Sequence, residues 1–216
     1  MVAHKWHHEQ IFRGSAAMQR LSKVRVAICG AGALGSNLAV SLVRQGLINL
    51  TVIDRDRVEP HNVGTQVYSL DDTGGLKAEI LRNLIYREAG EDVTVHAREL
   101  DAGNVSKLLK GHDLIVDAFD NSASRRTIAE FASKSAIACL HLGVNDQYGE
   151  IRWNENYVVP SDAGDDICDY PLARNLILLV TALAGEVIVR FILTEARQNL
   201  SVTLADLSIN RESDFG

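Results

Sequence analysis

The chain has 216 residues, 46% of them hydrophobic and 23% charged, and this balance is typical of a globular protein with a sizeable core. The composition excludes a disordered chain, a fibrous repeat and a small disulfide-stapled scaffold. A formal net charge of −6 argues against a dedicated nucleic-acid-binding protein, because such proteins displace counterions with basic surface.

Short apolar strands alternate with amphipathic helices through the first two thirds of the chain. After an N-terminal helix over 9–22, the pattern predicts strands over 24–29, 50–53, 93–97, 113–117 and 136–142. Helices are expected between these strands, over 33–44, 76–88, 104–109 and 124–134. Because this alternation is typical of βαβ crossovers, we expect an α/β fold with a Rossmann-like, doubly wound, mostly parallel sheet.

The pattern changes after about residue 143. Residues 150–153 alternate like an antiparallel strand, 172–198 form a long helical stretch, and 201–207 alternate again as a last strand. We therefore expect antiparallel strands added to the same sheet within a single domain over 1–216. Its parts would be the N-terminal helix (1–22), a first half over 23–143 and a second half over 144–216.

Three observations bear on the compartment. The three cysteines, at positions 29, 139 and 168, form no CxxC pair, so we expect no zinc and no disulfide framework. The N-terminal residues contain no apolar signal-peptide core. The apolar stretch at 176–189 is interrupted by polar residues and indicates a buried helix, not a membrane span. These features predict a cytoplasmic protein that binds no membrane.

A glycine-rich turn joins the first strand to the next helix. Residues 30–35 read Gly-Ala-Gly-Ala-Leu-Gly, which is the GxGxxG pattern in its required place between strand and helix. Such a turn lets a phosphate approach the backbone at the positive end of the helix. The candidate phosphate-binding residues are Gly30, Gly32, Ala33, Leu34 and Gly35.

Asp54 ends the next strand, where its carboxylate would accept hydrogen bonds from ribose hydroxyls. The turn and this aspartate together indicate a nucleotide. They do not distinguish NAD from ATP, so the residues that follow have to decide between them.

Three further strings follow in order: Asp-Arg-Asp-Arg-Val-Glu-Pro-His-Asn-Val-Gly-Thr-Gln at 54–66, Gly-Gly-Leu-Lys-Ala at 74–78, and Asp-Ala-Phe-Asp-Asn at 117–121 with Arg125 beyond. They resemble the E1-like family of ThiF, MoeB, HesA and the adenylation domains of ubiquitin-activating enzymes, over essentially the whole chain. The resemblance implies ATP-dependent adenylation of the C-terminal carboxylate of a small ubiquitin-like or sulfur-carrier protein, or of a peptide, with release of pyrophosphate by a homodimer. It also implies that 23–143 form the nucleotide-binding half and 144–216 the carrier-binding or crossover half.

The resemblance also implies roles for single residues. Lys77 would contact phosphate oxygens, and Asp120 would hold Mg²⁺, a hard ion that prefers carboxylate and phosphate oxygens. The remaining nucleotide-binding candidates are Asp54, Asp56, Arg57, Asn62, Gln66, Asp117, Asn121 and Arg125. Simpler interpretations stay open: Lys77 and Arg57 as solvated charges, Asp117 as a cap at the strand end, and Arg125 as a surface ion-pair partner.

Two arginines of the family pattern are missing. Thr65 stands where an arginine normally precedes the glutamine, and Glu9 stands in the N-terminal helix where the usual arginine reaches the ATP of the partner subunit. Arg57 and Arg13 are the candidates to replace them. If nothing replaces them, the alternative is a catalytically silent scaffold or one half of a heterodimer.

Cys168 lies in the expected crossover region, where several relatives keep a reactive cysteine, but its acidic neighbours oppose thiolate formation. Its role as a nucleophile therefore stays an open candidate. An NAD-dependent oxidoreductase is the less favoured hypothesis, since the sequence offers neither a substrate domain nor a candidate acid or base for hydride transfer.

Overall fold

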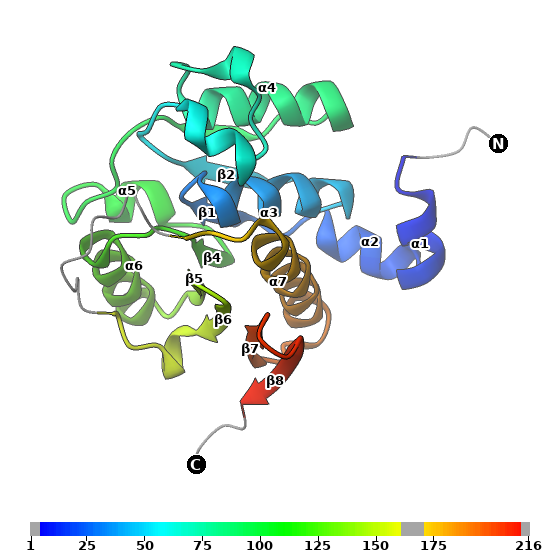
Figure 1. The fold of residues 1–216 in the computed structure, drawn as a ribbon. Coiled ribbons are helices and arrows are strands. Elements are labelled where there is room, and N and C mark those ends of the chain that lie inside the picture. The colour runs from blue at the N-terminus through cyan, green and yellow to red at the C-terminus, as the bar shows by residue number, and fades with distance from the viewer. Residues whose placement is uncertain (1–4, 161–170, 213–216) are drawn as a thin grey trace.

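The computed structural model describes residues 5–160 and 171–212, and its strands form one eight-stranded sheet in the order β3-β2-β1-β4-β5-β6-β7-β8 (Figure 1). The first five positions pair in parallel, and β6, β7 and β8 are added antiparallel. The strands are β1 (Val26–Cys29), β2 (Leu50–Ile53), β3 (Thr94–His96), β4 (Leu114–Asp117), β5 (Ala138–Asn145), β6 (Tyr148–Trp153), β7 (Asn199–Thr203) and β8 (Ser208–Glu212). The predicted α/β class and the change to antiparallel pairing are confirmed.

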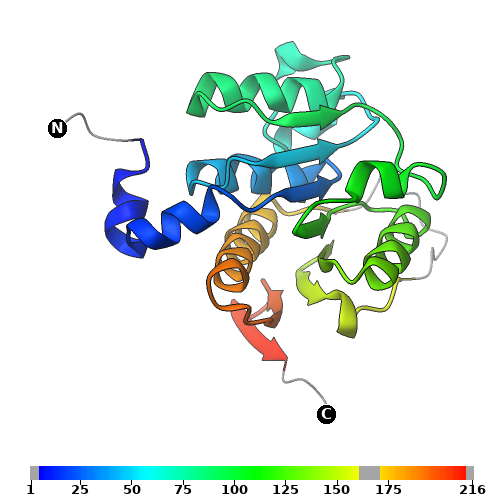
Figure 2. The same ribbon diagram turned by 180° about the vertical axis from the view of Figure 1, so that it is seen from behind.

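Helices cover both faces of this sheet, as Figures 1 and 2 show. α3, α4 and α7 pack on one face, whereas α5 and α6 pack on the other. The helices are α1 (His7–Arg13), α2 (Ser15–Leu21), α3 (Ala33–Arg44), α4 (Lys77–Ala89), α5 (Val105–Leu109), α6 (Ser122–Ser135) and α7 (Arg174–Thr194), with 3₁₀ turns η1 (Pro60–Gly64), η2 (Leu70–Asp72) and η3 (Asn154–Asn156).

The alternation of side chains along β1 explains why the sheet is covered twice. Val26 and Ile28 belong to the larger core under α3 and α7, while Ala27 and Cys29 belong to the smaller core under α5 and α6. All four are fully buried, as expected for a central parallel strand.

α7 is the most apolar helix of the described chain and the one whose length and composition would allow a membrane span. In the fold, 56% of its apolar window is buried. It packs along α3 and over β5 and β6, and the predicted buried helix is therefore confirmed.

The boundaries of several predicted elements are wrong for local reasons. The N-terminal helix is broken by Gly14, whose φ of 84° is outside the helical range, and β5 begins after Ala136, where φ is 53°. The long helix ends at Thr194 because Glu195 adopts φ 60°. The last strand ends at Thr203, not at residue 207, and a further strand, β8, follows it.

Candidate functional site

The carboxyl ends of β1, β2 and β4 meet at one edge of the sheet. Cys29, the last residue of β1, is in register with Ile53 of β2 and with Asp117 of β4. The segments that leave these strands therefore begin side by side. This edge is where nucleotide-binding α/β folds hold their ligands.

The three glycines of the turn at 30–35 meet different surroundings. Gly30 has φ 102°, and a Cβ on it would lie 2.9 Å from the carbonyl oxygen of Ala118. A Cβ on Gly35 would lie 1.9 Å from the carbonyl oxygen of Gly30. A Cβ on Gly32, the residue before the first turn of α3, would meet nothing within 4 Å. The turn is thus closed toward the fold and open on the side from which a phosphate would approach.

Asp54 holds this turn in place. Its Oδ2 accepts a hydrogen bond of 2.6 Å from the Ala31 N–H, and its Oδ1 accepts one of 2.7 Å from the Asp56 N–H. The side chain is almost fully buried, and this burial raises the pKa of Asp54 above its ordinary value although both hydrogen bonds act to lower it. Asp54 therefore anchors the turn.

Lys77 begins α4 beside the same turn. Its Nζ lies 3.4 Å from Oδ2 of Asp56, and its side chain is only 10% exposed, whereas that of Asp56 is 57% exposed. Tyr68 joins the two regions, since its hydroxyl donates to Ala31 O at 2.8 Å and lies 3.2 Å from Lys77 O. Burial raises the pKa of Tyr68 well above its ordinary value, so the hydroxyl stays a donor. The structure does not show the solvated lysine considered above, because this cation is largely buried.

Residues 62–66 lie against the start of α3. Asn62 is buried, but its Oδ1 already accepts the Glu59 N–H at 2.9 Å and so caps η1. The carbonyl of Thr65 accepts a 3.0 Å hydrogen bond from Nδ2 of Asn37 in α3. Oε1 of Gln66 is a buried acceptor without a hydrogen-bond partner among the described residues. A ligand hydroxyl or amide would satisfy it.

A second group of polar side chains surrounds the end of β4, and its Asp117 and His141 are fully buried. Oδ2 of Asp117 lies 2.8 Å from Nδ1 of His141 in β5, and Nε2 of His141 lies 2.8 Å from Oδ1 of Asn154. The ring of Tyr157 stacks on that of His141 at 3.7 Å. None of the sequence motifs above includes His141, Asn154 or Tyr157, although a histidine between two apolar residues of a buried strand is a signal for the first of them.

Arg125 belongs to this buried group as well. It donates to the Tyr157 hydroxyl and to the Leu142 carbonyl, both at 2.8 Å, and it lies 3.9 Å from Asp117. Burial acts to lower the pKa of Arg125, but Asp117 and Tyr157 raise it overall. The surface ion pair considered for Arg125 is wrong, because its side chain is only 10% exposed.

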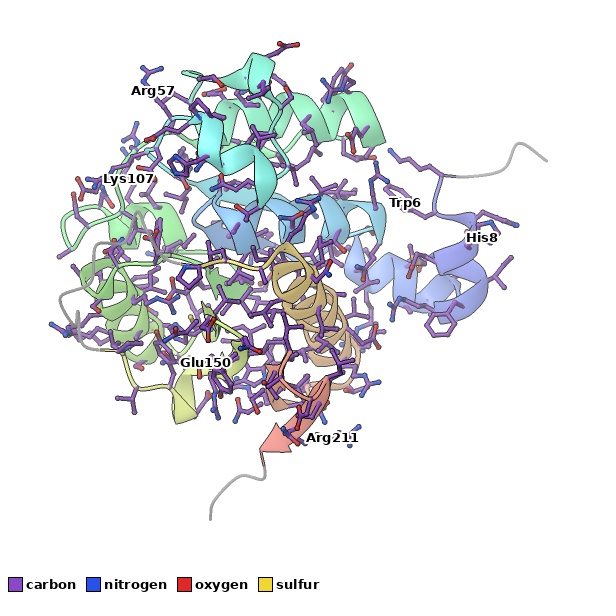
Figure 3. All side chains as sticks on the ribbon, viewed as in Figure 1. Trp6, His8, Arg57, Lys107, Glu150 and Arg211 are labelled. Atoms are coloured by element: carbon purple, nitrogen blue, oxygen red, sulfur yellow. The ribbon has the colours of Figure 1, made fainter. Side chains whose placement is uncertain are left out.

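The remaining candidates lie on the loops around the turn. Asp120 is exposed in the β4–α6 loop, and the side chain of Asn121 caps α6 by accepting the Ser124 N–H at 2.9 Å. Arg57 donates to Gly74 O at 2.6 Å and points outward from the fold (Figure 3). The loop positions of Asp120 and Arg57 leave both side chains accessible.

Arg13 lies in the N-terminal helix α1, whose ion pairs lead to α7 and not to this edge of the sheet. Arg13 forms ion pairs with Glu9 at 2.6 Å and Glu186 at 2.9 Å, so within its own chain it binds α1 to α7. Cys168 lies outside the described residues. Cys29 and Cys139 are buried, and burial raises their pKa well above the ordinary value, as expected for inert core thiols.

This geometry agrees with the comparison of the chain with known families. The ThiF family profile matches residues 7–212. The chain belongs to the ThiF family.

Individual relatives of this ThiF-family chain are adenylyltransferases by name. It is 32% identical over 151 residues to the sulfur carrier protein ThiS adenylyltransferase of Bacillus subtilis, which covers 67% of this chain and 45% of that protein. It is 33% identical over 144 residues to the adenylyltransferase and sulfurtransferase MOCS3 of Caenorhabditis briggsae, covering 65% of this chain and 34% of that one. The matched part thus spans about a third to a half of these relatives.

Solved structures confirm the fold. Escherichia coli MccB with MccA-N7isoASN matches with a TM-score of 0.82 at 18% identity, over 96% of this chain and 70% of that one. PaaA matches with a TM-score of 0.76 at 21% identity, over 93% of this chain and 67% of the PaaA chain. The predicted family and the Rossmann-like architecture are therefore confirmed.

Proposed function

We propose that the protein is an ATP-dependent adenylyltransferase that activates the C-terminal carboxylate of a small carrier protein or peptide and releases pyrophosphate. The observation that carries this proposal is the open face of the glycine turn at Gly32, with the largely buried cation of Lys77 joined to the same turn through Tyr68. Such a pairing of free backbone N–H groups with a fixed cation suits a polyphosphate.

The residues at this edge fit ATP. The turn would cradle phosphates, Lys77 would neutralise their charge, and the unpartnered Oε1 of Gln66 would accept a hydrogen bond from the nucleotide. Asp54 would bind the ribose only with the lone pairs that its two backbone hydrogen bonds leave free. Its buried carboxylate, fixed by these bonds, would suit ribose binding as well as holding the turn.

Asp120 is the residue we propose to hold Mg²⁺. Its carboxylate is exposed on the loop that follows β4, at the same edge of the sheet as the turn, and a hard divalent ion would bind it together with phosphate oxygens. When bound, the ion would offset negative charge on the phosphates. Asp117 is buried and engaged by His141, so it would position the strand end and not the metal.

The acyl substrate is proposed from the relatives' names. The Bacillus relative acts on the sulfur carrier ThiS by name, and one of the MccB structures contains MccA-N7isoASN. Residues 144–216 would receive the corresponding carrier or peptide in a cytoplasmic homodimer. In that dimer Arg13 would reach the partner's nucleotide once it is released from Glu186, and Cys168 stays a candidate acceptor.

ATP–pyrophosphate exchange tests the reaction directly. Labelled pyrophosphate should enter ATP only when enzyme, Mg²⁺ and a carrier with a free C-terminal carboxylate are all present. A carrier with an amidated C-terminus is the matched control and should support no exchange. ATP binding without exchange, across a panel of carriers from neighbouring genes, would overturn the adenylation proposal.

The second candidate is a catalytically silent, nucleotide-binding member of the family. Thr65 favours it, since threonine cannot provide the permanent charge of an arginine, and so do the two ion pairs that occupy Arg13. This protein would bind ATP and its carrier yet show no carrier-dependent exchange. Hydride transfer from NAD is not supported by the relatives named above.

A further inference from the structure

We infer that Arg174, the first residue of α7, provides a cation that binds the triphosphate of ATP. This inference rests on the proposed nucleotide-binding function and deepens it. No sequence motif points to Arg174, because it stands more than a hundred residues after Thr65. The fold brings the two positions together.

The contact that places Arg174 is with the backbone next to Thr65. Its Nη1 lies 3.3 Å from the carbonyl oxygen of Gly64, the residue that ends η1. The chain just before α7 is itself fixed, because Leu172 forms a parallel bridge with Asp146 at the end of β5. In Figure 1 the gold segment leading into α7 accordingly ends beside α3. Arg174 thus approaches residues 64–66 from the side of β5, on the same face of the sheet as α3.

Residues 64–68 are in turn held against the phosphate turn at two points. Nδ2 of Asn37 donates both to Thr65 O at 3.0 Å and to Ala33 O at 2.7 Å, in the first turn of α3. Three residues after Thr65, the Tyr68 hydroxyl donates to Ala31 O. A guanidinium on Gly64 is therefore next to a segment that touches both the turn and the helix N-terminus.

The charge of Arg174 is available in a way that the charges of Lys77 and Arg55 are not. The side chain is exposed, and among the described residues no carboxylate lies within ion-pair distance of it. By contrast, Lys77 faces Asp56 and Arg55 faces Glu99 at 2.8 Å. Among the described residues, Arg174 thus has no acidic partner and only a 3.3 Å contact with a carbonyl oxygen. Its side chain can therefore turn toward an anion without breaking an ion pair.

A phosphate is the anion that this position favours. Arg offers a planar set of donors that matches phosphate oxygens, and the site otherwise has a threonine at 65 where the triphosphate needs charge. The carboxylate of the acyl substrate presents similar oxygens at the same edge of the sheet. The experiment therefore has to separate the two anions.

The test compares the binding of ATP and of AMP by the full chain. Arg174→Ala should weaken ATP binding about 10- to 100-fold, as expected for loss of a charge-assisted hydrogen bond, and change AMP binding about threefold or less. Arg87→Ala is the control for loss of one arginine, since Arg87 is 74% exposed on α4. It should bind both nucleotides like the wild type.

Two variants separate charge from structure. Arg174→Gln keeps a donor for Gly64 O but no charge, so it should bind ATP as poorly as Arg174→Ala; wild-type affinity in this variant would show a purely structural role and overturn the inference. Thr65→Arg, added to Arg174→Ala, should restore ATP binding because it returns a guanidinium to the same place.

The remaining outcomes separate the role of Arg174 from the adenylation proposal. Unchanged ATP binding by Arg174→Ala, with weaker binding of the carrier but not of its amidated form, would assign the residue to the carboxylate and overturn the phosphate assignment. If the wild type binds ATP and loses it on Arg174→Ala but catalyses no exchange, the inference stands while the adenylation proposal fails. A wild type that binds no ATP overturns both.

Discussion

The N–H of Ala31, in the middle of the glycine turn, donates a 2.6 Å hydrogen bond to Oδ2 of Asp54 at the end of the neighbouring strand. The same carboxylate also accepts the Asp56 N–H, so one buried group fixes two loops at the edge of the sheet. The aspartate that a nucleotide-binding pattern assigns to the ribose is thus also the residue that shapes the phosphate turn.

Replacing Asp54 should therefore affect folding and binding together. Asp54→Asn keeps the size of the side chain but loses a charge-assisted acceptor, which should lower the free energy of unfolding by about 1–3 kcal/mol. ATP affinity should fall at least about tenfold, because the turn loses its anchor. Urea unfolding and equilibrium binding measure the two effects, with the exposed Asp92→Asn as the control. Weaker binding without any loss of stability would indicate a ribose contact alone.

The turn itself offers a matched pair of glycine variants. Gly32→Ala should change stability by no more than about 0.5 kcal/mol, since φ is −79° and the new methyl meets no atom within 4 Å, but this methyl would occupy the phosphate space and weaken ATP binding. Gly35→Ala should instead destabilise the fold by roughly 2–4 kcal/mol, because its methyl would lie 1.9 Å from Gly30 O. Wild-type ATP affinity in Gly32→Ala would show that no phosphate binds there.

The central fold was predictable because its signals are local. α3 and β2 begin and end as expected, since a glycine turn and an apolar strand are each defined by a few adjacent residues. β8 was missed because it is an edge strand with little apolar content, in which Ile209 is itself 49% exposed. The predicted long helix extends past the end of α7 because residues 195–198 include ordinary helix formers. The helix ends at Thr194 because Glu195 adopts φ 60°, and Arg197 beyond it packs over Trp153 and Phe191.

Only the motif-bearing half of the candidate site could be located from the sequence. The turn, Asp54 and Lys77 follow one another within a short stretch of chain, so their spacing identifies them. The pairing of Asp117 with His141 and the approach of Arg174 to Gly64 depend on which strands become neighbours. No spacing in the sequence encodes those contacts.

Lys77 should matter for activity more than for stability. Lys77→Ala removes the cation beside the turn but leaves Asp56, which is 57% exposed and well solvated without it. We expect a loss of about 10²–10³-fold in carrier-dependent exchange, the usual cost of removing one group that stabilises developing charge. Lys134→Ala, on the exposed face of α6, is the control. Exchange at the wild-type rate in Lys77→Ala would remove this lysine from the site.

Asp117, in contrast to Lys77, should matter for stability more than for ATP binding. It is fully buried against His141 and near Arg125, so Asp117→Ala leaves a buried guanidinium and imidazole without their carboxylate. We expect a loss of about 3–5 kcal/mol in the free energy of unfolding, measured by urea denaturation. The fraction that stays folded should bind ATP nearly as the wild type does. A selective loss of ATP affinity would instead make Asp117 a ligand.

The ion pair between Arg13 and Glu186 predicts a dependence of stability on pH. Partial burial acts to raise the pKa of Glu186, but the hydrogen bond and charge of Arg13 lower it below the ordinary 4.5. A carboxylate with a lowered pKa stabilises the fold above its unfolded-state pKa, and this contribution is lost as the pH falls through the folded-state value. The pair should thus stabilise the attachment of α1 to α7 at neutral pH and cease to do so in acid.

Glu186→Gln isolates this contribution. The variant should be less stable than the wild type by about 0.2–1 kcal/mol at pH 7, the range for a pair that is partly solvated. The difference should vanish as the pH falls through the lowered folded-state pKa of Glu186. Urea unfolding of both proteins at a series of pH values measures it. Arg190 shares Glu186, so Arg190→Ala is the control that tests whether Arg13 or its neighbour carries the effect. A stability difference that stays constant across this pH range would show that Glu186 acts through packing and not through its charge.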